Sequence, residues 1–163
     1  CQVADLHGKA DPDTAVEEMA ALAHRYNDAL CVIENNGMGY AHVAAASRVP
    51  GLRLWKQPAK GEDKPRKIGV DMSEGMRNLM VAASLRAVNR GLVRVCSKEL
   101  IRELRTYDPQ KHLGDRHSAW QLANWGAEIA IREAPDGPEA FQARRTTRGG
   151  IPAMSGVYFH ART

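Results

Sequence analysis

The chain has 163 residues, of which 44% are hydrophobic and 26% charged, and its formal net charge at pH 7 is +4. This length fits one domain with a real core, and the mild positive charge is compatible with a polyanionic partner as well as with a plain soluble protein. No apolar run is long enough to span a membrane, no signal peptide opens the chain, and the cysteines lack zinc-site spacing. Cys31 and Cys96 are expected to be small buried residues, and a reducing cytoplasm is the simplest compartment.

The predicted elements of the first third alternate between strands and helices. Residues 1–7 are predicted as a strand, and the Asp-Pro-Asp-Thr run at 11–14 predicts a helix start because Asp and Thr are common caps. Residues 29–34 are an apolar run between turn signals, which is typical of a strand buried on both faces. A helix is expected over 38–49, stopped by Pro and Gly, and a short strand over 52–55.

The alternation continues through the rest of the chain. A polar loop with two prolines and two glycines occupies 56–69, and Ser73 is expected to cap a long helix that ends at 89 before a glycine. The remaining predictions are a strand at 92–95, a helix over 98–107 capped by Ser97, a turn at 112–117, a helix over 118–133 and a flexible basic tail over 135–163. Strands that alternate with helices predict an α/β three-layer domain.

A carboxylate stands directly after the predicted buried strand. Glu34 is followed by Asn35, Asn36 and Gly37, with a second glycine at position 39. Because ligand and metal sites of open α/β sheets lie at the carboxyl ends of strands, Glu34 is a candidate metal ligand or catalytic acid. The alternative is a hydrogen-bonded strand-end acid before an Asn-Asn-Gly turn. The two asparagines either orient Glu34 and touch a substrate or only build the turn, and the glycines allow close backbone approach.

Four motifs, taken in order, resemble the nuclease domain of phage terminase large subunits. They are the apolar run ending in Glu34-Asn35-Asn36-Gly37, the segment Gly69…Ser73…Arg77…Met80, the segment Ser97…Leu100…Glu103-Leu104…Tyr107, and the segment Gly114-Asp115-Arg116-His117-Ser118-Ala119. The resemblance covers roughly residues 1–133, and the order and spacing of the motifs make it more specific than any one of them.

The resemblance implies an RNase H-like fold over residues 1–134, with a mixed central sheet flanked by helices. It implies a two-metal DNA endonuclease that cuts viral DNA during genome packaging, with Glu34 and Asp115 as catalytic ligands of Mg²⁺ or Mn²⁺. The implied partners are double-stranded DNA, the portal and the small terminase subunit, with no membrane. The implied setting is the cytoplasm of a bacterial host cell infected by a bacteriophage or carrying a prophage.

The chain departs from the family pattern in three ways. Its opening segment matches the family's third strand, so the first two strands and the first catalytic aspartate are expected to be missing from this chain. The last motif has Gly114-Asp115-Arg116 where two aspartates are usual, and no phosphate-binding loop of an ATPase occurs. The alternative function is therefore a catalytically incomplete RNase H-like module that binds DNA or packaging partners without cutting.

Further candidate residues surround these acids. Asn35, Asp71 and His117 are accessory candidates, although a loop aspartate and an exposed histidine are the commoner outcomes, and Asp115 is alternatively a helix cap. The DNA-binding candidates are basic residues of the 56–69 loop and of the following helix, which would contact phosphates without sequence preference: Lys56, Lys60, Lys64, Arg66, Lys67 and Arg77. A solvated lysine-rich loop is the alternative.

Overall fold

The computed structural model describes residues 8–57, 67–108 and 114–132, and it confirms a mixed α/β chain. Helices dominate these ranges, and two short strands pair antiparallel. The elements are α1 (Pro12–Arg25), α2 (Gly39–Ala46), β1 (Lys56–Gln57), β2 (Lys67–Ile68), α3 (Glu74–Asn89), α4 (Lys98–Arg105) and α5 (Asp115–Arg132). The predicted strand at 1–7, the centre of the 56–69 loop and the tail at 135–163 lie outside the described residues.

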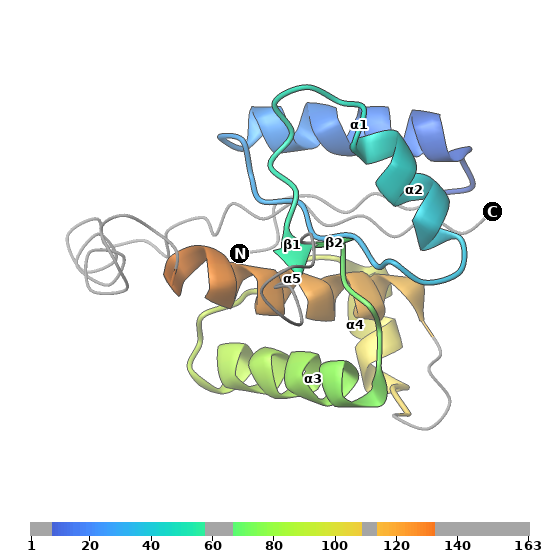
Figure 1. Ribbon diagram of the computed structural model, residues 1–163. Helices are drawn as coiled ribbons and strands as arrows, with labels where there is room; N and C mark the ends of the chain where they lie inside the picture. The colour runs from blue at the N-terminus through green and yellow to red at the C-terminus, as the bar shows by residue number, and fades with distance from the viewer. Residues whose placement is uncertain (1–7, 58–66, 109–113, 133–163) are drawn as a thin grey trace.

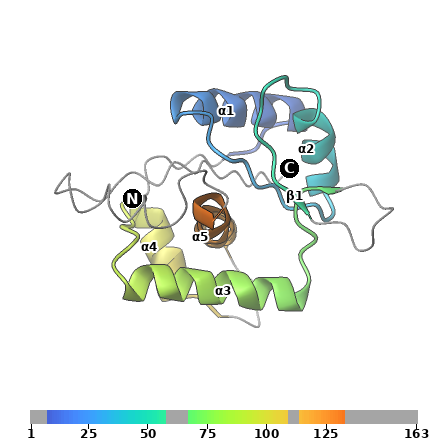
Figure 2. The ribbon, with the colours of Figure 1, turned by 60° about the vertical axis from the view of Figure 1, so that its left-hand side comes forward.

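The helices form two groups on opposite sides of a thin layer of extended backbone. Helices α1 and α2 lie above this layer in Figure 1, and α5 lies below it with α3 beneath. Figure 2 views α5 nearly end-on and shows the same order, with α5 between α3 and the extended layer. In the described part of the chain, helices therefore lie on both sides of the extended segments.

The extended layer is built around residues 29–35. A parallel bridge joins Cys31 to Leu54, and a second parallel bridge joins Glu34 to Val70. The amide of Asn35 donates a 2.8 Å hydrogen bond to the Val70 carbonyl. Two parallel segments need a crossover, and α2 supplies it between the first pair. The predicted strand at 29–34 is thus central, although its regular pairing is limited to single bridges.

The side chains of this central segment alternate between two hydrophobic clusters. Cys31 and Ile33 pack in one cluster, and Val32 with Leu30 packs in the other. The first cluster is completed by side chains of α1, α2 and the segment that follows α2: Val16, Met19, Ala23, Val43, Ala45, Ala46, Val49, Leu52 and Leu54. The second is completed by side chains of α3, α5 and the neighbouring segments: Trp55, Val70, Met72, Met76, Met80, Leu122, Trp125 and Ile129. Period-two alternation between two cores is what a strand buried on both faces requires.

Three predicted helix caps are confirmed. The Asp11 carboxylate accepts hydrogen bonds from the amides of Asp13 and Thr14 and from the Thr14 hydroxyl, and the bond from this hydroxyl lowers the pKa of Asp11 most. Ser73 accepts from the Met76 amide at the start of α3, and Ser97 accepts from the Leu100 amide at the start of α4. Each cap satisfies an amide that has no partner within its own helix.

The predicted strand at 92–95 is wrong, because its first residue completes the end of α3. Gly91 adopts a left-handed conformation with φ of 61°. The amide of Gly91 donates to the carbonyl of Val88 at 2.9 Å, and that of Leu92 donates to the carbonyl of Ala87 at 2.8 Å. These are the two hydrogen bonds of a Schellman motif, which turns the chain away from the helix axis. Residues 92–97 then run without regular pairing.

Three other predictions need correction. The ends of the 56–69 loop are not irregular, because Lys56 pairs with Ile68 and Gln57 with Lys67 as β1 and β2. Cys96 is exposed, whereas Cys31 is buried as expected. Several helix ends also differ by two or three residues: α2 stops at Ala46, α4 stops at Arg105, and α5 begins at Asp115.

Candidate functional site

Glu34 lies at the end of the central segment, where the chain turns into α2. Its side chain is half-buried, and among the described residues its carboxylate has neither a hydrogen-bond partner nor an ion-pair partner. The backbone after it is tightly folded, since Gly37 adopts a φ of 53°. A Cβ at Gly39 would stand 1.9 Å from the Glu34 carbonyl oxygen. The expected close backbone approach is therefore present at Gly39, and it sets the first turn of α2 directly against Glu34.

The two asparagines fasten this turn to the segment before α3. Asn35 is 2% exposed, and its Nδ2 donates to the Ile68 carbonyl at 3.1 Å. The Asn36 Oδ1 accepts from the Met72 amide at 2.9 Å, and its Nδ2 donates to the Met72 carbonyl at 3.4 Å. The Oδ1 of Asn35 is buried without a partner among the described residues. The amides thus build and brace the turn, as one of the two alternatives expected.

Asp71 is a loop residue with an ion-pair partner. Its Oδ1 lies 2.7 Å from the Lys67 Nζ, and this hydrogen bond is the largest influence that raises the pKa of Lys67. Lys67 Nζ also lies 5.6 Å from the centre of the Tyr40 ring. Asp71 and Lys67 therefore largely neutralise each other beside the start of α2.

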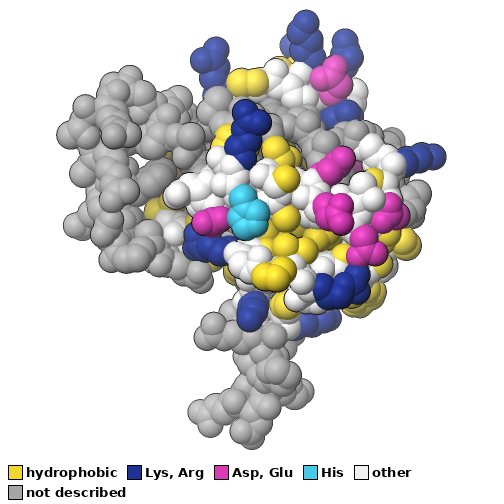
Figure 3. All heavy atoms as spheres, turned by 90° about the horizontal axis from the view of Figure 1, so that it is seen from above, with side chains coloured by type: hydrophobic (Ala, Val, Ile, Leu, Met, Phe, Trp, Pro, Cys, Tyr) yellow, Lys and Arg dark blue, Asp and Glu magenta, His cyan; other side chains and the backbone are white. Residues whose placement is uncertain are grey.

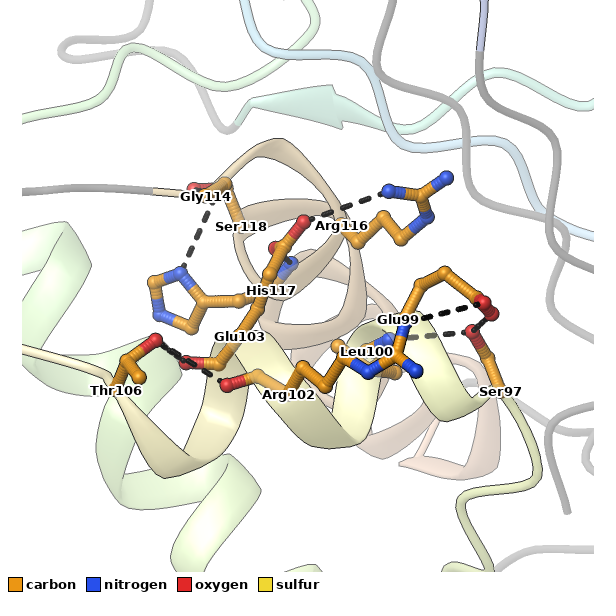
Figure 4. Close-up of polar contacts among 10 residues, drawn as sticks. All are labelled: Ser97, Glu99, Leu100, Arg102, Glu103, Thr106, Gly114, Arg116, His117 and Ser118. Atoms are coloured by element: carbon orange, nitrogen blue, oxygen red, sulfur yellow. Dashed lines mark hydrogen bonds and ion pairs between the residues drawn. The ribbon is translucent and has the colours of Figure 1, made fainter.

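Asp115 is the first residue of α5, and Glu103 of α4 contacts the residues that follow it (Figure 4). The Oε2 atom of Glu103 accepts a 2.9 Å hydrogen bond from the His117 amide, while its Oε1 atom lies 3.6 Å from the Arg116 Nη1. A Cβ at Gly114 would stand 2.6 Å from the same Oε2. Glu103 thus does for α5 what a local cap does for other helices, and it does so from the neighbouring helix.

His117 is buried rather than exposed. It is 3% exposed, its ring centre lies 4.1 Å from that of Tyr107, and its Nδ1 is 3.3 Å from the Gly114 carbonyl oxygen. The expectation failed because α5 begins three residues earlier than predicted, so that His117 belongs to a helix and packs against the α4 side instead of lying in a solvated turn.

The predicted DNA-binding residues are only partly described. Lys56 is exposed on β1, Lys67 is paired with Asp71, and Arg77 is half-buried in the first turn of α3. Lys60, Lys64 and Arg66 lie outside the described residues. On the face covered by α1 and α2, the described Lys and Arg side chains lie scattered and the acidic ones gather toward one side, so this face is a poor candidate for binding DNA (Figure 3).

The turn before α2 and the beginning of α5 lie toward the same end of the molecule in Figure 1. Carboxylate oxygens at these two places suit Mg²⁺ or Mn²⁺ in kind, and Mg²⁺ is often held by one or two carboxylates with water and substrate phosphates completing its coordination. Within the described ranges, no cluster of three or more His, Cys, Asp and Glu side chains is placed to hold a metal. Glu34 and Asp115 are the metal-ligand candidates that the sequence predicts, and neither belongs to such a cluster within those ranges. Glu103 contacts the residues that follow Asp115, and the sequence did not predict these contacts.

No family model, curated protein or solved structure matches this chain. Of the helices that the structure describes, none combines the length and the apolar character needed to cross a membrane.

Proposed function

We propose that this chain is part of a metal-dependent DNA endonuclease with an RNase H-like fold, of the kind found in viral genome-packaging terminases. The observation that carries the proposal is the carboxylate of Glu34, half-buried at the end of the central segment and without a partner among the described residues. The parallel bridges from that segment to Leu54 and Val70 and the helices on both its faces are compatible with this fold.

That the described residues offer Glu34 no partner favours a ligand role over a structural one. A carboxylate that is partly removed from water loses hydration, and proteins normally compensate with hydrogen bonds or an opposite charge. The structural alternative for Glu34, a hydrogen-bonded strand-end acid, predicts such bonds, and the described residues supply none. A divalent cation is the partner that would compensate this carboxylate and also give it a function.

In this proposal Glu34 and Asp115 hold the metal, and a third acid comes from outside this chain. The bound ions would polarise the phosphodiester and lower the pKa of an attacking water. The chain's own contribution is to fix its carboxylates: the bridge to Val70 and the Asn36 amide hold the turn at Glu34. In this proposal Lys56 and Arg77 contact phosphates of the DNA. The portal and the small terminase subunit are the proposed further partners, and the bacterial host cytoplasm is the proposed compartment.

Plasmid nicking in Mn²⁺ tests the proposal. The 163-residue chain is compared with Glu34→Gln and with Glu18→Gln, a matched change at an exposed position of α1. We expect weak nicking by the wild type and by Glu18→Gln and none by Glu34→Gln. Added Mn²⁺ should likewise raise the melting temperature of the wild type and of Glu18→Gln but not that of Glu34→Gln. Nicking or Mn²⁺ stabilisation that survives in Glu34→Gln contradicts the proposal.

A second candidate function is a DNA-binding module that does not cut. The observation that favours it is that the described ranges contain no group of three metal ligands and offer only two candidate carboxylates. Three results would distinguish it from the nuclease. The chain slows plasmid DNA in a gel mobility assay, it makes no nicks at any Mn²⁺ concentration, and Glu34→Gln slows the DNA as much as the wild type does.

A further inference from the structure

We propose that Glu103 is a positioning residue for Asp115, an inference that rests on the proposed metal-dependent function. Glu103 belongs to α4, whereas Asp115 is the first residue of α5. Glu103 binds the His117 amide and Arg116 (Figure 4), and in this way it positions the start of α5, from which the Asp115 side chain extends.

The carboxylate of Glu103 lies beside Gly114, which precedes Asp115, and binds residues that follow Asp115. Before it, Gly114 lies so close that a Cβ there would be 2.6 Å from the Glu103 Oε2. After it, the His117 amide donates to that oxygen at 2.9 Å and Arg116 Nη1 lies 3.6 Å from the other oxygen. The start of α5, which carries Asp115, is therefore tied to the Glu103 carboxylate by one hydrogen bond and one ion pair.

This arrangement replaces a local cap. The first amides of a helix have no partner within it, and a negative group near them is stabilising. At α3 and α4 a serine just before the helix supplies the acceptor, whereas α5 is preceded by Gly114, which has no side chain. Gly114 adopts a φ of 121°, and the carboxylate of Glu103 fills the space that a side chain would need.

The helix that carries Glu103 is itself held in place by packing. Leu100, one turn before Glu103 on α4, is buried, and α4 packs against α5. His117 stacks beside Tyr107 just beyond the end of α4. Movement of Glu103 relative to the start of α5 is thus limited on both sides, as a residue that orients a metal ligand requires.

The test uses the whole chain and a readout that does not depend on cutting. Paramagnetic broadening of backbone amide resonances by added Mn²⁺ is measured at residues 34–37 and 115–118 in the wild type, Glu103→Ala, Glu103→Gln and Glu128→Gln. Glu128 is the matched control, because its carboxylate ties α5 to Arg86 of α3 at 2.9 Å, away from the start of α5. Glu103→Gln keeps an oxygen that can accept from the His117 amide.

We expect broadening at both segments in the wild type and in Glu128→Gln. In Glu103→Ala, half-maximal broadening at 115–118 should need about tenfold more Mn²⁺, the usual cost of removing a group that orients a ligand, while Glu103→Gln restores most of it. If the wild type broadens both segments and Glu103→Ala behaves identically, or Glu128→Gln loses as much as Glu103→Ala, Glu103 is not a positioning residue and the proposed function stands. If the wild type broadens neither segment, the metal-dependent function itself is overturned and this inference with it.

Discussion

Gly39 offers the sharpest test of how the candidate site is built. It is the first residue of α2, and a Cβ added there would lie 1.9 Å from the carbonyl oxygen of Glu34 and 2.8 Å from its carbonyl carbon. Both atoms are backbone, so no change of rotamer can relieve the clash. Relief requires α2 to move away from the central segment, which the bridge between Glu34 and Val70 holds in place.

The expected loss of stability for Gly39→Ala follows from two opposing effects. Alanine in a helix is more favourable than glycine by about 0.5–1 kcal/mol, whereas overpacking a well-filled site costs about 1–3 kcal/mol. Because the clash is with fixed backbone, we expect the upper part of that range and a net loss of about 2 kcal/mol. For a chain of this size the melting temperature should fall by about 4–8 °C.

Gly75→Ala is the matched control for this substitution. Gly75 also lies in the first turn of a helix, α3, but a Cβ there meets no atom within 4 Å. Urea denaturation of the two variants and the wild type gives the comparison. Gly75→Ala should be as stable as the wild type or more so, by up to about 1 kcal/mol. If Gly39→Ala proves equally stable, α2 does not start against Glu34 and the described geometry of the turn is wrong.

Two further predictions concern the buried side chains. Leu122 of α5 is 1% exposed in the cluster beneath the central segment, so Leu122→Ala should lower the free energy of unfolding, measured with urea, by about 2–5 kcal/mol. Leu79 is 57% exposed, so Leu79→Ala should change this free energy by less than about 0.5 kcal/mol. Equal effects of the two substitutions would contradict the placement of the core. Burial raises the pKa of the Cys31 thiol from its usual 9.0 to about 11. The unfolded chain therefore loses this proton first as the pH rises, so the stability that the buried thiol contributes is complete below pH 9 and is lost toward pH 11. The wild type should lose about 2 kcal/mol of stability over that interval, Cys31→Ala should abolish this loss, and Cys96→Ala should not. Identical stability–pH profiles of Cys31→Ala and the wild type would refute the burial of Cys31.

The features that the sequence predicted well are those decided by neighbours in the chain. The caps at Asp11, Ser73 and Ser97 depend on amides two or three residues away, so their side chains carry enough information on their own. The burial of residues 29–34 on both faces followed from an apolar run of strand length. The place of Glu34 at the end of that run was predicted for the same reason, since it requires only the order of residues.

The failures share a different cause, because each depends on a distant partner or on a competing local bond. Leu92 looked like the start of a strand, but its amide is used by the Schellman motif of α3. His117 looked like part of a solvated turn, because nothing near it in the sequence announces that Glu103 caps α5 from another helix. The pairing of β1 with β2 likewise joins both ends of a segment whose composition alone predicts a loop. Such features depend on tertiary contacts, which a single sequence does not display.

The central segment also determines how the molecule should come apart. Residues 30–33 form a common wall, with alternate side chains belonging to the cluster under α1 and α2 and to the cluster over α3 and α5. The hydrophobic cluster of each helical group is therefore complete only with side chains of this shared segment. Loss of one group would leave half of the wall facing water and weaken the other, so we expect the described part of the chain to unfold cooperatively, without an intermediate that keeps one helical layer intact.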